Sequence, residues 1–183
     1  MDDITFFLAA LKFASLKHRD QRRKSGNVSV PYINHPIEVA DTLSRVGGVC
    51  DRVTIVGALL HDTLEDTNTT PEEIHDLFGE QVLTLVQAVT DNKNLPKPER
   101  KRLQIEEAPH KSLRAKQLKL ADKICNVYDI AHSPPNNWSL KRCQEYIDWS
   151  EQVVAGLRGV NSALESHYDA ILAEARNKLN CEL

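Results

Sequence analysis

Hydrophobic residues recur at helical spacing along almost the whole chain. In residues 4–24, Ile4, Phe7, Leu8 and Leu11 repeat every three or four positions, which predicts a helix with a basic last turn. No alternation of polar and apolar residues persists beyond a few positions, so strands are not expected. The pattern therefore predicts an all-α fold.

Capping residues and helix breakers divide the rest of the chain into helices. Thr70-Pro71-Glu72-Glu73 has the form of a capping box with proline at the first helical position, and Ser162 with Glu165 predicts a second box. Asp51 and Ser112 open two further helices, and residues 133–137 interrupt the pattern. After the first helix, we expect helices over residues 36–45, 51–61, 71–78, 82–89, 99–107, 112–130, 139–157 and 162–179.

Composition is that of an ordinary globular protein. The 183 residues, 41% of them hydrophobic and 27% charged, predict a single domain over residues 1–183. No apolar run reaches the roughly 18–20 residues that span a bilayer, and the acidic N-terminus lacks the layout of a signal peptide. The four scattered cysteines form no CxxC pair, so neither a zinc knuckle nor a disulfide framework is expected. These features predict a cytoplasmic protein with reduced thiols.

The pair His61-Asp62 carries the strongest chemical signal in the chain. It follows the apolar stretch 58–60, where a histidine and a carboxylate are poor core residues but good ligands for a divalent ion. Glu65 and Asp66 come three to five positions later, so on a helix they can lie near the same site. Ligands followed by a general acid or base within reach are typical of a metal-assisted hydrolase.

Two other residues can complete such a site. His35 stands between a loop and a helix and precedes Pro36, while Asp122 has apolar neighbours that predict an inward-facing position. An inward aspartate is costly unless it is paired or bound to a metal. His35, His61, Asp62 and Asp122 therefore make a plausible mixed nitrogen and oxygen site, which by itself admits manganese, iron, cobalt or zinc.

Five blocks of the sequence resemble the RelA/SpoT-type hydrolase domain of the HD superfamily, and specifically its stand-alone small alarmone hydrolases. They are KHRDQRRK (17–24), PYINHP (31–36), ALLHDTLEDT (58–67), LPKPERKR (95–102) and KLADK (119–123). The resemblance covers most of the chain and implies an HD-type helical bundle with a mononuclear metal site. It also implies hydrolysis of the 3′-pyrophosphate of guanosine tetra- or pentaphosphate to GDP or GTP and pyrophosphate.

The resemblance also assigns roles to individual residues. One Mn²⁺ would be held by His35, His61, Asp62 and Asp122, while Glu65 and Asp66 would position and deprotonate the attacking water. Arg23, Lys24 and Asn126 fall at substrate-contacting positions. Lys97, Arg142 and Tyr146 are predicted at the rim of the pocket, although a run of charges such as residues 100–102 is equally compatible with a solvated face.

Other functions stay open at this point. The resemblance extends to removal of the 2′-phosphate of NADPH at the same site, and a catalytically silent nucleotide sensor is a more remote alternative. Nucleic-acid binding is disfavoured because the net charge is −3 and no aromatic residues interleave with the basic runs. The expected partner is a small anionic nucleotide, with no membrane association; the sequence leaves the oligomeric state open.

Overall fold

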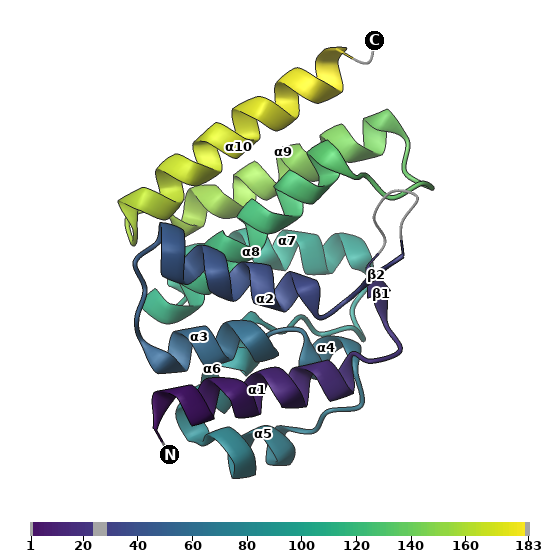
Figure 1. The fold of residues 1–183 in the computed structure, drawn as a ribbon. Coiled ribbons are helices and arrows are strands. Elements are labelled where there is room, and N and C mark those ends of the chain that lie inside the picture. The colour runs from purple at the N-terminus through teal and green to yellow at the C-terminus, as the bar shows by residue number, and fades with distance from the viewer. Residues whose placement is uncertain (1, 24–28, 182–183) are drawn as a thin grey trace.

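Helices dominate the computed structural model, which describes residues 2–23 and 29–181 (Figure 1). The α-helices are α1 (Asp3–Lys17), α2 (Asn34–Asp41), α3 (Arg52–Leu60), α4 (Thr63–Asp66), α5 (Pro71–Phe78), α6 (Glu80–Val89), α7 (Lys97–Glu107), α8 (Leu113–His132), α9 (Leu140–Leu157) and α10 (Ser162–Cys181). A 3₁₀ turn (Ala108–His110) follows α7. The all-α prediction is confirmed. No helix in the described ranges is long and apolar enough to cross a bilayer.

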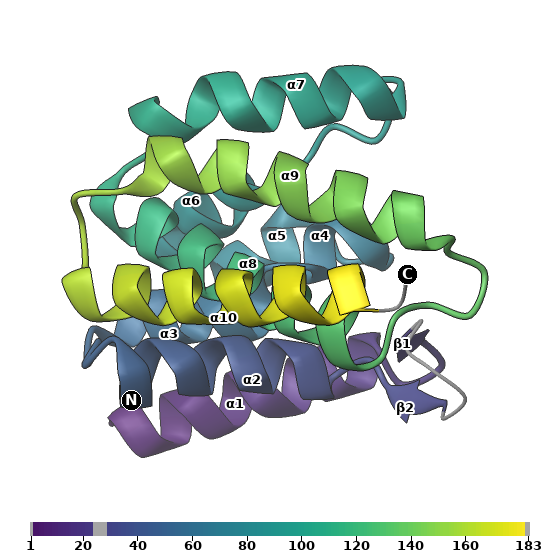
Figure 2. The ribbon, with the colours of Figure 1, turned by 90° about the horizontal axis from the view of Figure 1, so that it is seen from above.

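Helix α8 lies in the middle of the bundle. It packs against α2, α3 and α6 on one side and against α9 and α10 on the other (Figures 1 and 2). Leu118 and Leu120 point in nearly opposite directions from the helix, and both are completely buried. A helix that is apolar on opposite faces is enclosed by its neighbours. Any polar side chain in the middle of α8 must therefore find its partners inside the protein.

Three of the predicted helix starts are confirmed. The side chain of Asp51 accepts a hydrogen bond from Thr54 N at the start of α3, and Ser112 accepts one from Ala115 N at the start of α8. Thr70 opens α5 with the complete capping box. Side-chain acceptors satisfy amide groups that the first turn of a helix leaves unpaired. The cap at Asp51 thereby fixes the start of α3, the helix that ends next to His61.

The first helix is shorter than predicted, because it ends at Lys17 and not at Lys24. The ring of His18 is buried and its Nδ1 lies 2.7 Å from Gln21 Oε1, while Tyr32 N donates to Gln21 O over 3.1 Å. The chain therefore turns into strand β1 (Arg22–Arg23), which pairs antiparallel with strand β2 (Val30–Pro31). This short hairpin was not expected from the sequence, because contacts with distant residues stabilise it.

The second helix also departs from a regular continuation. It begins at Asn34, with Pro36 in its first turn as predicted, but residues Thr42–Val46 form a π-helix. Gly47 N donates to Thr42 O over 3.1 Å, which is the wider spacing of that conformation. The helical segment ends at Val46, one residue beyond the predicted end near Arg45. The change from α-helix to π-helix carried no sequence signal.

The predicted capping box at Ser162 is wrong by one residue. Asn161 caps α10, because its Oδ1 accepts a hydrogen bond from Leu164 N over 3.1 Å. The Glu165 carboxylate accepts bonds from the backbone amides of Gly159, Val160 and Asn161. Asparagine is as good an N-cap as serine, and here it also binds Gly47 O through its amide nitrogen, which serine is too short to do.

Gly57 lets α3 approach α6 closely, one turn before His61. A Cβ atom added at Gly57 would lie 2.5 Å from Cδ2 of Leu85, which is 4% exposed. Leu85 is held in the core and has little room to move. The absence of a side chain at Gly57 therefore sets the distance between the two helices.

We predict that Gly57→Ala lowers the free energy of unfolding by about 1–2 kcal/mol, because overpacking outweighs the gain in helix propensity. Urea denaturation measures this. Leu85→Ala is the matched variant, and alone it should lower the free energy of unfolding by about 2–5 kcal/mol. The loss in the double variant should be smaller than the sum of the two single losses. A Gly57→Ala protein more stable than the parent would show that helix propensity decides the outcome.

Candidate functional site

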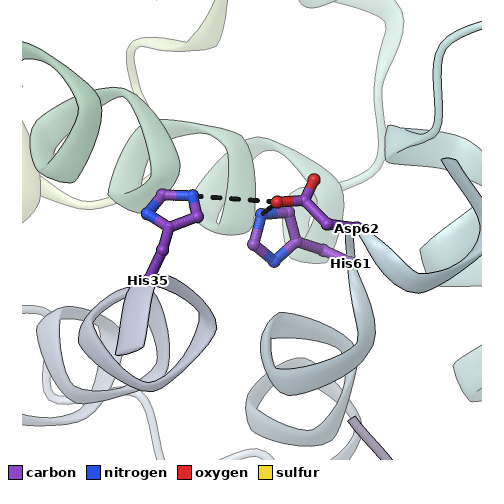
Figure 3. A group of neighbouring side chains, drawn as sticks. All are labelled: His35, His61 and Asp62. Carbon is purple, nitrogen blue, oxygen red and sulfur yellow. Dashed lines mark ion pairs between the residues drawn. The ribbon is translucent and has the colours of Figure 1, made fainter. Parts of the chain in front are cut away.

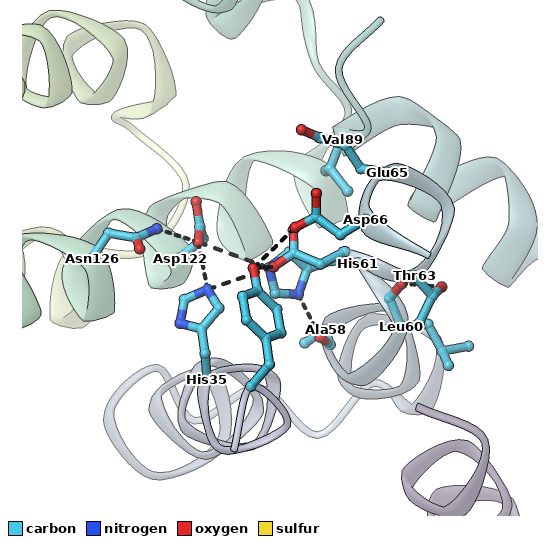
Figure 4. Close-up of polar contacts among 12 residues, drawn as sticks. His35, Ala58, Leu60, His61, Thr63, Glu65, Asp66, Val89, Asp122 and Asn126 are labelled. Atoms are coloured by element: carbon cyan, nitrogen blue, oxygen red, sulfur yellow. Dashed lines mark hydrogen bonds and ion pairs between the residues drawn. The ribbon is translucent and has the colours of Figure 1, made fainter. Parts of the chain in front are cut away.

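The predicted ligands come together from three parts of the bundle (Figure 4). His35 lies in the first turn of α2, His61 and Asp62 lie between α3 and α4, and Asp122 is in the middle of α8. Nε2 or Nδ1 of the two histidines and a carboxylate oxygen of Asp62 lie within 4.8 Å of one another (Figure 3). Asp122 Oδ1 is 3.1 Å from His35 Nε2 and 3.8 Å from His61 Nε2. The structure thus gathers four side chains that sequence reasoning proposed as ligands.

The ring of His61 is oriented by its own helix. Its Nδ1 lies 2.7 Å from the carbonyl oxygen of Ala58, to which it donates, so Nε2 faces the cluster. Nε2 is buried and makes no well-aligned hydrogen bond among the described residues, although Asp62 Oδ2 lies 3.1 Å away. Burial by itself lowers the pKa of His61, but the Asp62 carboxylate, 3.1 Å away, raises it to about 9. The site therefore attracts a cation at Nε2, either a proton or a metal ion that replaces it.

Neighbouring side chains hold the two aspartates. Asp122 accepts hydrogen bonds from Asn126 Nδ2 over 2.6 Å and from Lys123 Nζ over 2.9 Å. Burial by itself raises a carboxyl pKa, but Lys123 and the histidines hold the pKa of Asp122 well below its usual range. Asp62 accepts a bond from the Tyr32 hydroxyl over 2.6 Å. Both carboxylates are therefore ionised and oriented, and two imidazoles with two carboxylates suit a divalent transition metal.

Glu65 and Asp66 project from α4 into the same hollow. Glu65 Oε2 accepts a hydrogen bond from Asp91 N over 3.0 Å, and burial raises the pKa of the Glu65 carboxyl. Asp66 Oδ2 is 3.3 Å from the Tyr32 hydroxyl, and its other oxygen pairs with Lys93. A carboxylate of raised basicity beside a metal-ligand cluster can accept a proton from water.

The ligand cluster lies in a hollow of about 180 Å³, called here the inner cavity, which adjoins two larger hollows. Arg23, Tyr32, Asp66 and Asn126 line both the inner cavity and a hollow of about 330 Å³. Asp91 and Gln104 line both the inner cavity and a hollow of about 550 Å³. Trp138 and Tyr146 line both larger hollows. The three hollows are thus neighbours that share lining residues, and together they are called the cleft.

The predicted substrate contacts fall along this cleft. Arg23 donates to Asn126 Oδ1 over 2.6 Å and to Asp129 Oδ2 over 2.9 Å, which fixes its guanidinium at the mouth of the inner cavity. Lys97, Arg142 and Tyr146 all line the hollow of about 550 Å³. Lys24 lies outside the described residues.

The tryptophans that line the hollow of about 550 Å³ contact several cationic side chains. The Arg142 guanidinium lies over the Trp138 ring, 4.3 Å from its centre. Trp149 has the Lys101 ammonium 4.7 Å and the Lys123 ammonium 5.0 Å from its ring centre, and its Nε1 donates to Lys101 O. Cation–π contacts fix flexible basic side chains in one position. The cleft is therefore both basic and stiff.

Sequence reasoning missed several residues of the inner cavity, among them Tyr32, Lys119 and Lys123. Tyr32 packs between the His18 ring, 4.9 Å between centres, and the Arg23 guanidinium, 5.8 Å from its ring centre. Lys119 and Lys123 line the cavity from α8 and are almost fully buried. A usable signal was present, because Tyr32 lies in the block that contains His35, and both lysines lie within one turn of Asp122.

Comparisons with known proteins place the chain among close relatives. The sequence model of the HD domain family matches residues 10–147. The guanosine-3′,5′-bis(diphosphate) 3′-pyrophosphohydrolase MESH1 of Xenopus tropicalis is 53% identical over 91% of this chain and 93% of its own length. The human MESH1 is 54% identical over 86% of this chain and 88% of its own length. A solved structure described as a metazoan ortholog of SpoT that hydrolyzes ppGpp superposes with a TM-score of 0.90. It is 44% identical and covers 92% of this chain and 94% of its own.

Lys119 is an unusual residue for the inside of a bundle. It is 5% exposed, and its Nζ makes a long hydrogen bond of 3.4 Å to the Val89 carbonyl. Burial, reinforced by repulsion from Lys123, lowers the pKa of Lys119 from 10.5 to about 8. The folded protein therefore disfavours the charged form that the unfolded chain accepts freely.

We predict that Lys119→Met raises the free energy of unfolding of the metal-free protein by about 1–3 kcal/mol at neutral pH. Because the folded pKa of Lys119 is depressed, the penalty is complete below about pH 8 and disappears as pH rises towards 10.5. The gain should shrink over that window. Urea denaturation across these pH values, with Lys116→Met as a control on the same helix, measures it; a gain independent of pH would contradict the prediction.

Proposed function

Because the chain belongs to the HD domain family and, within it, to the guanosine-3′,5′-bis(diphosphate) 3′-pyrophosphohydrolases, we propose that it hydrolyses the 3′-pyrophosphate of guanosine tetra- and pentaphosphate. The products are GDP or GTP and pyrophosphate. The observation that carries the proposal is the inner cavity, where two histidines and two aspartates meet beside Glu65 and Asp66 at the end of a basic cleft.

The reaction consumes one water molecule. Its oxygen forms a bond to the phosphorus that is attached to the 3′ oxygen of the ribose, that P–O bond breaks, and a proton passes to the 3′ oxygen. Glu65 accepts the proton of the attacking water, since burial raises the pKa of its carboxyl and the Asp91 amide fixes its orientation. Asp66 orients the same water, and the Tyr32 hydroxyl links Asp66 to Asp62.

We propose that one Mn²⁺ is held by His35, His61, Asp62 and Asp122. The buried His61 Nε2, which makes no well-aligned hydrogen bond among the described residues, and the mixed nitrogen and oxygen donor set support this assignment. When bound, a divalent ion supplies positive charge beside the phosphate and acidifies water in the site. Tyr32 and Asn126 orient the ligands by donating to Asp62 and Asp122 respectively.

The cleft supplies the charge that the nucleotide needs. Guanosine tetraphosphate carries two diphosphate groups. Arg23 and the neighbouring Asn126 are assigned to it from one side, and Lys24 is assigned to it from the resemblance of its sequence block. Lys97 and Arg142 bind from the hollow of about 550 Å³, and Tyr146 packs against the nucleotide there. Guanidinium groups bind phosphate oxygens in pairs, so preorganised arginines stabilise the charge of the transition state. We also propose a cytoplasmic location, with which the free thiols of Cys50 and Cys125 agree.

We predict that Glu65→Gln lowers kcat for guanosine tetraphosphate by about 10²–10⁴-fold and changes KM little, because the amide keeps the shape but cannot accept a proton. Glu72→Gln is the control, since Glu72 is exposed on α5. Release of pyrophosphate gives the rates. If the unmodified protein and the variant both bind the nucleotide and neither hydrolyses it, the chain is a nucleotide sensor and not this enzyme.

We predict one Mn²⁺ per chain, and that chelation abolishes turnover while Mn²⁺ restores it better than other divalent ions. Tyr32→Phe removes the hydroxyl that donates to Asp62 and should weaken Mn²⁺ binding about tenfold. Calorimetric titration of the metal-free protein measures this affinity without turnover. Tyr128→Phe serves as the control, because Tyr128 is exposed near the end of α8. Equal affinities of the two variants would remove Tyr32 from the metal site.

A further inference from the structure

The inner cavity contains a buried positive charge that no carboxylate neutralises. Of the cations that line it, Arg23 pairs with Asp129 over 2.8 Å and Lys123 pairs with Asp122 over 2.9 Å. Lys119 forms no ion pair with any residue that the structure describes, and the carbonyl of Val89 is its hydrogen-bond partner. A carbonyl at the end of α6 orients an ammonium group but does not cancel its charge.

A second cation beside the cavity is also incompletely satisfied. Arg100 lies 3.9 Å from both Glu65 and Asp91, beyond hydrogen-bond distance, and its Nε is buried without a partner in the described chain. Asp91 lines both the inner cavity and the hollow that Arg100 lines. Arg100 is thus loosely ion-paired and partly exposed, whereas Lys119 is a buried cation without a counter-charge. Such buried charges are rare, because they lose their hydration and gain little in return. The presence of both cations at one place indicates that an anion completes it.

We propose that Lys119 binds the terminal phosphate of the 3′-diphosphate and so makes the enzyme prefer a diphosphate over a monophosphate at that position. The inference rests on the proposed function, in which the inner phosphate is attacked at the ligand cluster. The terminal phosphate is bonded directly to the inner one, so it must lie within the same small cavity, and Lys119 lines that cavity. A 3′-monophosphate leaves Lys119 unpaired.

The decisive comparison uses two substrates that differ by one phosphate. Guanosine 5′-diphosphate 3′-diphosphate and guanosine 5′-diphosphate 3′-monophosphate are supplied to the manganese-loaded enzyme. In Lys119→Met, the ratio of kcat/KM for the first over the second should fall by about 10–100-fold, the loss expected for a hydrogen bond to a charged group. Lys119→Arg keeps the charge and should keep part of the preference. Lys116→Met is the control, since Lys116 lines none of the three hollows.

A binding measurement separates this inference from the proposed function. Calorimetry with pyrophosphate and with orthophosphate should show tighter binding of pyrophosphate to the unmodified enzyme, and Lys119→Met should remove most of the difference. If the enzyme hydrolyses neither nucleotide but this binding pattern holds, the assignment of Lys119 as a diphosphate-binding residue is supported and the proposed function fails. The inference is overturned if turnover is normal and Lys119→Met leaves unchanged both the kcat/KM ratio of the two nucleotides and the affinity ratio of pyrophosphate to orthophosphate. It is also overturned if Lys119→Met lowers kcat/KM for the two nucleotides equally. A Lys119→Met protein that melts well below the unmodified one would assign Lys119 a structural role instead.

Discussion

The aspartate in the middle of α8 is the constraint around which the bundle is built. A carboxylate in an enclosed helix cannot stay charged unless donors and cations reach it from every side. Lys123, the next residue of α8, and Asn126, one turn later, do so from the same helix, and His35 approaches from α2. The packing of α2 and α3 against α8 therefore brings groups that stabilise the buried charge of Asp122. Packing of the core and assembly of the site are one requirement.

The parts of the fold that could be predicted from sequence are those fixed by neighbouring residues. The caps at Asp51, Thr70 and Ser112 act within one helical turn, and each was found. The end of α1 was missed because it depends on a contact between the rings of His18 and Tyr32, which are 14 positions apart. At α10, Asn161 was overlooked because its second bond, to Gly47, is visible only in three dimensions.

The same distinction applies to the site. His61-Asp62 stands out because it interrupts an apolar helix, which is a local contrast. His35 and Asp122 are 87 positions apart; their residue types and local settings made them candidate ligands, the resemblance of whole blocks supported the pairing, and the structure brings them within 3.1 Å. Tyr32 and Lys119 lie in the same blocks but were not assigned a role in the site. The role of a tyrosine before a loop histidine, or of a lysine on a helix, depends on the groups that its side chain contacts in the folded protein.

Both tryptophans of the chain, Trp138 and Trp149, line the hollow of about 550 Å³. Each indole ring has a cationic side chain within 5 Å of its centre, Arg142 in the first case and Lys101 in the second. A phosphate group that draws those cations away changes the electric field at the rings. The tryptophan fluorescence of the protein therefore originates at the binding cleft. Occupancy can be followed in real time by emission intensity and wavelength, without a label and without turnover.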